Sequence, residues 1–182
     1  MKVTRTALPE VLLLEPRVFG DDRGFFMESW NARTFREATG VDVDFVQDNH
    51  SRSARNVLRG IHYQVVRPQG KLVRVVSGAV FDVAVDLRKS SPNFGKWVGV
   101  ELSAENKRQL WVPPGFGHGF LVTTESADFL YKTTEYWYQE HDRSLRWDDA
   151  DLGIDWRLAG AGPLLAAKDA AAPRVAEAEV YE

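Results

Sequence analysis

The feature of this sequence that most constrains its fold is a run of alternating side chains at residues 74–88. Four apolar residues occupy every second position near its end, and four mostly polar ones fill the positions between: Phe81, Val83, Val85 and Leu87 against Asp82, Ala84, Asp86 and Arg88. A period of two is that of a β-strand, whose successive side chains point to opposite faces. The run predicts a half-buried strand, with Ser77-Gly78 supplying the turn before it.

Similar short apolar runs recur along the chain, and turn residues separate them. The runs are 11–14, 43–46, 95–102, 110–112, 120–124 and 129–134, and the turns are Pro68-Gln69-Gly70, Ser91-Pro92-Asn93 and Pro113-Pro114-Gly115. Many short strands at this spacing predict an all-β, antiparallel sandwich or barrel, of which the jelly roll is the best match.

Helical signals are few. Asn31 can cap a helix over residues 32–39, and Gly40 can close it. Residues 158–179 are rich in alanine but are interrupted by Pro163 and Pro173, so short helical turns are expected there. Because no repeat, long charge run or linker is visible, residues 1–182 are expected to form one domain with a few short peripheral helices.

The composition narrows the possible functions. A chain of 182 residues with 44% hydrophobic content can bury a core without covalent staples. It has no cysteine, which excludes disulfides and thiolate chemistry and fits a reducing compartment, so a cytoplasmic location is expected. The apolar run at 11–14 is too short for a signal peptide or a membrane span, so no membrane partner is expected.

One stretch is distinctly basic. No Asp or Glu occurs from Asn49 through Phe81, although the formal net charge of the chain is -3; the basic residues inside the stretch are Arg52, Arg55, Arg59, Arg67, Lys71 and Arg74. A basic pocket on an acidic protein suggests a small anionic ligand. Binding of long nucleic acid, which needs many contacts to phosphates, is not expected.

Three sequence blocks together resemble the dTDP-4-dehydrorhamnose 3,5-epimerase family of the cupin superfamily. They are DDRGFFME (21–28), QDNHS (47–51) leading into LRGIHYQ (58–64), and PPGFGHGF (113–120), with shorter matches at 81–88, 129–132 and 167–173. The resemblance implies a cupin-type jelly roll and an isomerase of dTDP-L-rhamnose biosynthesis. Such an enzyme inverts carbons 3 and 5 of a dTDP-linked 4-keto-6-deoxy-hexose.

That reaction needs three groups, because both carbons flank a ketone and lose a proton only if the keto oxygen accepts the charge. A base must lie on one face, a cation at the oxygen and an acid on the opposite face. The resemblance assigns His62 as base with Asp169 as its partner, Lys71 as cation and Tyr131 as acid. Taken singly, each has a plainer interpretation: a satisfied strand histidine, a solvated acid or helix cap, a surface lysine and a core aromatic.

A second set of positions matches the family's substrate-binding residues: Arg23, Glu28, Gln47, Asn49, Arg59, His118 and Lys168. Arg23 and Arg59 suit a diphosphate, which a guanidinium grips in a bidentate fork. Tyr136 is a candidate for stacking on the thymine. The family's acidic position before the tryptophan strand falls on Asp142 by ungapped count, with Glu140 as the alternative.

Metal and cofactor are not expected. Metal-binding cupins present a His-x-His pair with a following Glu, and a further His in the second block. Here His62-Tyr63-Gln64 and a lone His118 stand instead, and a single retained histidine cannot hold a metal.

Three alternatives stay open at this point. A mono-epimerase acting at carbon 3 or carbon 5 would share all the catalytic residues. A jelly-roll module that binds a nucleotide-sugar without turnover is compatible with the fold, and a metal-dependent cupin oxygenase is opposed by the missing ligands. The resemblance also implies a homodimer that exchanges N-terminal strands, which would carry Arg23 or Glu28 into the partner's pocket.

Overall fold

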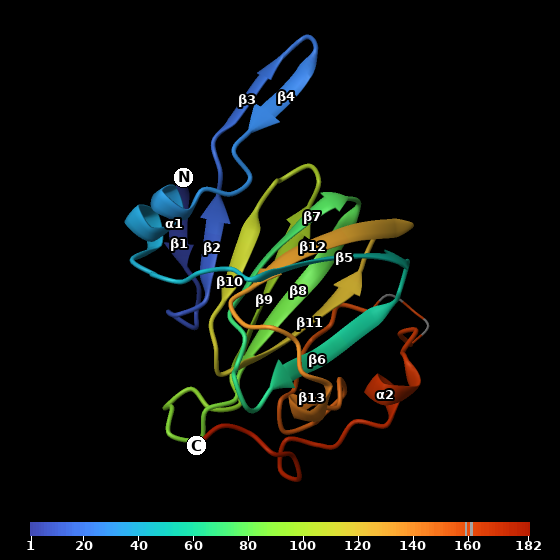
Figure 1. The fold of residues 1–182 in the computed structure, drawn as a ribbon. Helices are drawn as coiled ribbons and strands as arrows, with labels where there is room; N and C mark the ends of the chain where they lie inside the picture. The colour runs from blue at the N-terminus through green and yellow to red at the C-terminus, as the bar shows by residue number, and fades with distance from the viewer. Residues whose placement is uncertain (159, 161) are drawn as a thin grey trace.

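The computed structural model describes residues 1–158, 160 and 162–182, and within them the chain folds into two facing antiparallel β-sheets (Figure 1). The six-stranded sheet runs in the order β1 (Lys2–Arg5), β2 (Leu12–Glu15), β10 (Gln109–Val112), β7 (Lys71–Ser77), β12 (Ser126–Thr133) and β5 (Gln47–Ala54). The five-stranded sheet runs in the order β13 (Asp142–Ser144), β6 (Leu58–Gln64), β11 (Phe116–Val122), β8 (Ala79–Asp86) and β9 (Trp97–Ser103). Successive strands from β5 to β8 and from β9 to β13 alternate between the sheets, which is the connectivity of a jelly roll.

Five of the six further runs predicted as strands contribute to strands, and the sixth is wrong. Residues 43–46 are irregular, and β5 begins only at Gln47. Val43 and Phe45 are partly buried against the cluster around Phe35 and Trp111. The alternation of apolar residues here therefore reflects the packing of an irregular segment against this cluster. Strand pairing begins only as the chain reaches the sheet edge, where the Val46 N–H donates to Thr133 O at 2.9 Å.

The strand β8 is buried on both faces, so the prediction of a half-buried strand is wrong. Val80 and Ala84 pack between the two sheets, while Phe81 and Val83 pack on the outer side of the five-stranded sheet. That outer side is covered by residues from the C-terminal part of the chain: Leu145, Leu152, Trp156 and Val180. The two aspartates of the strand are therefore fully buried as well.

The helices agree with the prediction. In α1 (Ala32–Thr39), Asn31 Oδ1 accepts the Thr34 N–H at 3.1 Å, and Gly40 ends the helix at a φ of 74°. Among the described residues of the alanine-rich region the one helix is the single turn α2 (Ala167–Ala170), and a 3₁₀ turn η1 (Gln139–His141) precedes β13. No helix in the described part of the chain is long and apolar enough to cross a membrane.

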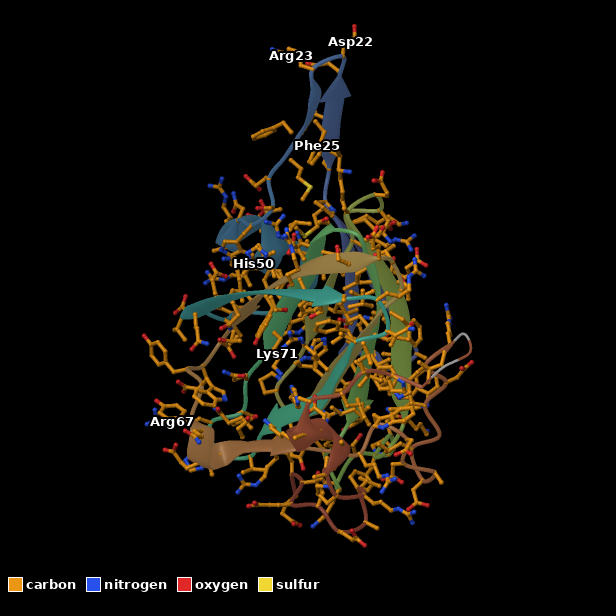
Figure 2. All side chains as sticks on the ribbon, turned by 90° about the vertical axis from the view of Figure 1, so that its right-hand side faces the viewer. Asp22, Arg23, Phe25, His50, Arg67 and Lys71 are labelled. Carbon is orange, nitrogen blue, oxygen red and sulfur yellow. The ribbon has the colours of Figure 1, made fainter. Side chains whose placement is uncertain are left out.

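One element stands away from the body. The hairpin of β3 (Val18–Asp21) and β4 (Gly24–Met27) pairs only with itself and projects beyond the two sheets (Figure 1). Its aromatic side chains are exposed, Phe25 by 62% and Phe26 by 70%. Figure 2 places Asp22 and Arg23 at its far tip.

Candidate active site

A cavity of about 250 Å³ opens between the two sheets. Its walls come from β5, β6, β7, β11 and β12: Asn49, His50, Ser51, Arg59, His62, Lys71, His118, Gly119, Phe120, Phe129 and Tyr131. Six of the thirteen predicted site residues, from five separate strands, therefore meet in one cavity. They include three of the four predicted catalytic residues.

The fourth, Asp169, lies directly behind His62. His62 Nε2 is 2.6 Å from Asp169 Oδ1, and the Gly60 N–H donates to Asp169 Oδ2 at 3.3 Å. Burial acts to raise the pKa of Asp169, but the hydrogen bond and charge of His62, with the Gly60 N–H, outweigh it and hold that pKa below its ordinary value. Because Nε2 is bound to the carboxylate, Nδ1 is the ring nitrogen left to meet a ligand.

Close contact between β6 and β11 fixes the position of His62 in the cavity wall. A Cβ at Gly60 would lie 2.5 Å from Gly119 Cα, so the two backbones touch and only glycine fits. His62 and His118 are register partners across this strand pair. The two imidazoles are therefore presented side by side from neighbouring strands.

Lys71 and Tyr131 supply the other two groups. Burial lowers the pKa of Lys71 to about 8, and the carboxylates of Asp142 and Asp82 oppose that shift. Its Nζ donates to His62 O at 3.4 Å. Burial raises the pKa of Tyr131, so the phenol keeps its proton at neutral pH and can act as an acid.

His118 is held by a carboxylate that the sequence did not reveal. Its Nε2 is 2.9 and 3.0 Å from the two carboxylate oxygens of Asp82 on β8, and both residues are buried. The only signal in the sequence is an aspartate within a strand of apolar residues. From the sequence alone this aspartate could equally face solvent, because its burial depends on the distant residues that cover β8.

Two amide side chains lie close together on β5, and that of Asn49 lines the cavity. Gln47 Nε2 donates to Asn49 Oδ1 at 3.0 Å, while Asn49 Nδ2 is buried with no hydrogen-bond partner among the described residues. A buried donor without a partner is costly, and a ligand in the cavity would satisfy it. Arg59 donates from Nε to Ser53 Oγ at 2.9 Å.

Asp142 rather than Glu140 lies with the other predicted residues. Asp142 forms an ion pair with Lys168 and acts on the pKa values of Lys71 and Tyr131, while Glu140 is exposed. Tyr136 is 54% exposed and lies outside the cavity wall. It lies in the loop after β12, where its backbone O accepts a hydrogen bond from Gln64 Nε2.

Arg23 and Glu28 are not brought to this cavity within one chain. Arg23 pairs with Asp21 in its own hairpin, and Figure 2 shows the hairpin tip far from Lys71. Glu28 accepts from Asn31 Nδ2 at 3.1 Å and from Thr34 Oγ1 at 3.4 Å, beside the start of α1.

No group of three or more His, Asp or Glu side chains able to hold a metal ion is found among the residues that the structure describes. Metal independence and cofactor independence stay predictions.

The cavity combines an imidazole backed by a buried carboxylate, an ammonium and a protonated phenol, in a jelly roll. This combination defines an isomerase of cupin fold that moves protons at carbon beside a carbonyl. The family model of dTDP-4-dehydrorhamnose 3,5-epimerase matches residues 5–177, and the chain belongs to this family.

Individual proteins agree with the family match. The chain is 62% identical over 181 residues to a dTDP-4-dehydrorhamnose 3,5-epimerase of Pseudomonas aeruginosa, covering 100% of this chain and 99% of the relative. A crystal structure of a dTDP-6-deoxy-D-glucose-3,5-epimerase from Legionella pneumophila in complex with dTDP-4-keto-L-rhamnose is 50% identical, with a TM-score of 0.95 over 98% of this chain and 94% of that one. A 3'-monoepimerase from Streptomyces bikiniensis in complex with dTDP-quinovose is 35% identical, with a TM-score of 0.89 over 97% of this chain and 88% of that one.

Proposed function

We propose that His62, Lys71 and Tyr131 carry out the proton transfers of this family's reaction, with Asp169 supporting His62. The protein is an isomerase that converts dTDP-4-dehydro-6-deoxy-D-glucose into dTDP-4-dehydro-L-rhamnose. The observation that carries the assignment of roles is that the three side chains line one cavity from three different strands, β6, β12 and β7.

The base acts first. His62 Nδ1 takes the proton from carbon 3 or carbon 5, and the electron pair of that bond forms the enolate as the carbonyl pair moves onto oxygen. Asp169, bound to Nε2, stabilises the imidazolium that results. In the D-gluco configuration the hydrogens on both carbons lie on the same face of the ring, so one base serves both.

The cation and the acid complete each inversion. Lys71 places its ammonium at the enolate oxygen, where a buried charge stabilises the developing anion most strongly. Tyr131 then gives its proton to the carbon from the opposite face and recovers one from solvent, while the imidazolium of His62 releases the proton it took to solvent, so no atom is gained or lost. The cycle occurs once at each carbon.

The remaining predicted residues hold the nucleotide and the sugar. Arg59 binds the diphosphate, Tyr136 stacks on the thymine, and Gln47, His118, Asp142 and Lys168 take polar groups of the substrate. Asn49 Nδ2, which is buried and has no hydrogen-bond partner among the described residues, supports a ligand in the cavity. The dTDP-sugar ligands of the Legionella and Streptomyces structures support a substrate of the same class.

Two copies of the chain form the active unit in this proposal. An isolated two-stranded hairpin is marginally stable in water, and β3–β4 exposes Phe25 and Phe26. A second cavity of about 240 Å³, lined by Trp30, Leu72 and Leu130 among others, lies on the outer face of the six-stranded sheet. A second copy bound at this cavity buries both the exposed hairpin and the cavity itself. Each hairpin then brings Arg23 and Glu28 to the active-site cavity of the other copy.

The enzyme works in the cytoplasm and without metal or cofactor in this proposal. The absence of cysteine from the sequence supports a reducing compartment. Turnover should be unchanged after dialysis against EDTA, and a loss that Mg²⁺ or Zn²⁺ restores would contradict this.

Hydrogen exchange in deuterated water tests the assigned roles. The wild type should place deuterium on both carbons of the thymidine-linked sugar, as followed by proton NMR. His62→Ala should lose both exchanges while still binding dTDP. His141→Ala, a histidine outside the cavity wall, is the matched control and should retain both.

The same experiment separates the alternatives. Label at only one carbon in the wild type would identify a mono-epimerase, and binding without any exchange would identify a binding module. Full exchange by His62→Ala would remove His62 from its proposed role.

A further inference from the structure

Two histidine–carboxylate pairs face this cavity, and only one of them has a role in the mechanism above. His62 and His118 are register partners on β6 and β11, and each bonds through Nε2 to a buried carboxylate, Asp169 or Asp82. Asp82 is 0% exposed and comes from a third strand, β8. A buried carboxylate is costly unless nearby groups compensate for its charge.

The compensating groups are the imidazole of His118 and the ammonium of Lys71. Burial raises the pKa of Asp82, and the imidazole of His118 and the ammonium of Lys71 oppose that rise. Lys71 in turn is influenced by Asp82 from β8, by Asp142 from β13 and by Lys168 from α2. The other charged or titratable groups of the cavity wall are Arg59, His50, His62 with Asp169 behind it, His118 and Tyr131.

We propose that Asp82 is a positioning residue: it fixes His118 as the Nε2–H tautomer, with Nδ1 left to accept a hydrogen bond from a sugar hydroxyl, and it keeps Lys71 protonated for the enolate. The inference rests on the proposed role of Lys71. Both carboxylate oxygens of Asp82 lie within 3.0 Å of His118 Nε2, so this is the ring nitrogen that carries the proton. The Nε2–H then donates to Asp82, and the anion of Asp82 balances the ammonium of Lys71.

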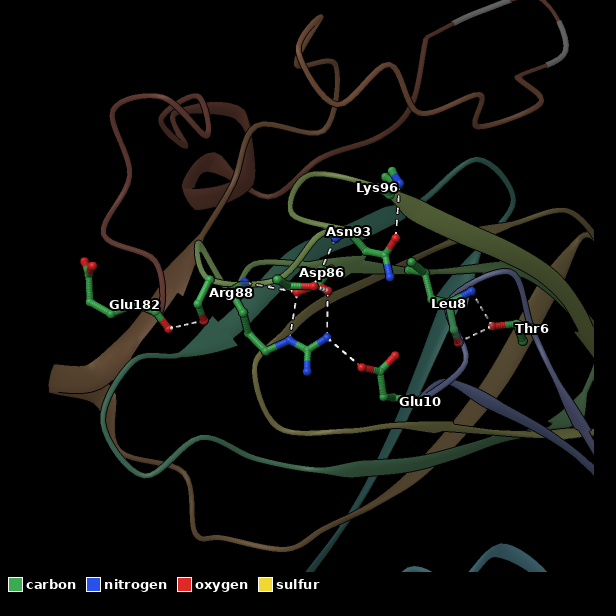
Figure 3. Close-up of polar contacts among 10 residues, drawn as sticks. Thr6, Leu8, Glu10, Asp86, Arg88, Asn93, Lys96 and Glu182 are labelled. Atoms are coloured by element: carbon green, nitrogen blue, oxygen red, sulfur yellow. Dashed lines mark hydrogen bonds and ion pairs between the residues drawn. The ribbon is translucent and has the colours of Figure 1, made fainter.

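The test compares two isosteric substitutions on one strand. Asp82→Asn removes the charge, and an asparagine N–H can donate to Nε2 and reverse the tautomer. Asp86→Asn is the matched control, because Asp86 lies on the same strand and face, is equally buried, and bonds to Arg88 and Ser91 outside the cavity (Figure 3). Both variants should lower the thermal midpoint.

Only Asp82→Asn should change catalysis. Its kcat should fall by about tenfold or more at pH 7, the alkaline limb of its kcat profile should move to lower pH, and its KM should rise, because Lys71 and His118 have lost their support. Asp86→Asn should keep the wild-type kcat, KM and pH profile. Wild-type kcat, KM and pH profile in Asp82→Asn would overturn the inference.

A second measurement needs no variant and so does not depend on folding. Nitrogen-15 NMR of imidazole-labelled wild type should show His118 with Nε2 protonated and Nδ1 unprotonated at pH 7.5. A protonated Nδ1 with bare Nε2 would overturn the tautomer assignment.

Lys71→Met, assayed in parallel, separates this inference from the proposed function. If Lys71→Met retained full kcat, the role of Lys71 would be lost, and with it the part of the inference that depends on Lys71. If Lys71→Met lost activity while Asp82→Asn did not, the inference alone would fail.

Discussion

At the residue scale, what distinguishes His62 from an ordinary strand histidine is the group behind it. Its Nε2 meets a carboxylate that is 107 positions away in the sequence, and that carboxylate is fixed by a backbone N–H. A buried acid with its pKa held low stays ionised across the working pH range. In the proposed mechanism, the imidazolium formed during proton abstraction is therefore stabilised without any rearrangement.

Asp169→Asn should lower kcat by roughly 10²- to 10⁴-fold, as in other histidine–aspartate pairs that lose the charge of the acid. Binding of dTDP, measured calorimetrically, should change little because Asp169 lies behind the histidine. Asp151→Asn, an exposed position, provides the control. A variant with near wild-type kcat would show that the pair is structural.

In the proposed mechanism, Lys71 sets the alkaline side of the activity profile. Its pKa is lowered to about 8, and its charged form is the one that stabilises the enolate, so kcat should fall as pH rises through about 8. Tyr131 does not account for this limb, because burial raises its pKa. Steady-state rates from pH 6 to pH 10 check this, and a flat profile to pH 10 would contradict it.

At the element scale, features that depend on neighbouring residues were predicted correctly, whereas features that depend on residues far away in the sequence were not. The caps of α1 depend on Asn31 and Gly40 alone, so the sequence predicted the helix to the residue. The burial of β8 depends on Trp156 and Val180, which no pattern within the strand can report. The burial of Asp82 was not predicted for the same reason, because it depends on the residues that cover both faces of the strand.

The contact between β6 and β11 should tolerate no side chain. A Cβ at Gly119 would lie 2.8 Å from Arg59 O and 3.3 Å from Gly60 Cα, and backbone atoms cannot move aside cheaply. Gly119→Ala should lower the free energy of unfolding by roughly 2 kcal/mol or more in urea titrations.

A second glycine supplies the comparison. Gly20→Ala meets only an ordinary contact, 3.6 Å from Gly24 O, and should unfold like the wild type. Equal unfolding free energies for Gly119→Ala and the wild type would show that the strands can separate at little cost.

At the scale of the whole molecule, the family blocks indicated which residues belong to the site but not which copy supplies them. Six predicted residues meet in one cavity of a single chain, whereas Arg23 lies at the tip of a projecting hairpin. A linear sequence carries no record of chain exchange. The choice between Asp142 and Glu140 was also open in the sequence, and the ion pair of Asp142 with Lys168 favours Asp142.

Mixing inactive variants tests whether Arg23 acts in the partner. Co-expressed His62→Ala and Arg23→Ala chains should regain about one quarter of wild-type activity, because random pairing gives half mixed dimers, each with one intact site. Both variants alone should be nearly inactive.

The control is a pair of lesions within one cavity. His62→Ala mixed with Lys71→Met should regain nothing, since each chain then keeps a damaged cavity of its own. Failure of the first mixture to exceed the second would place Arg23 in its own chain's site or outside the mechanism.

The C-terminal segment both covers the outer side of the five-stranded sheet and carries Asp169 to His62. A ribosome that has released the chain as far as Ser144 has therefore made the strands, the lysine and the imidazole, but not the carboxylate that supports the base. Proton abstraction starts only after the last segment docks, so a polypeptide cut short near its end would be silent toward the sugar even where its sheets survive.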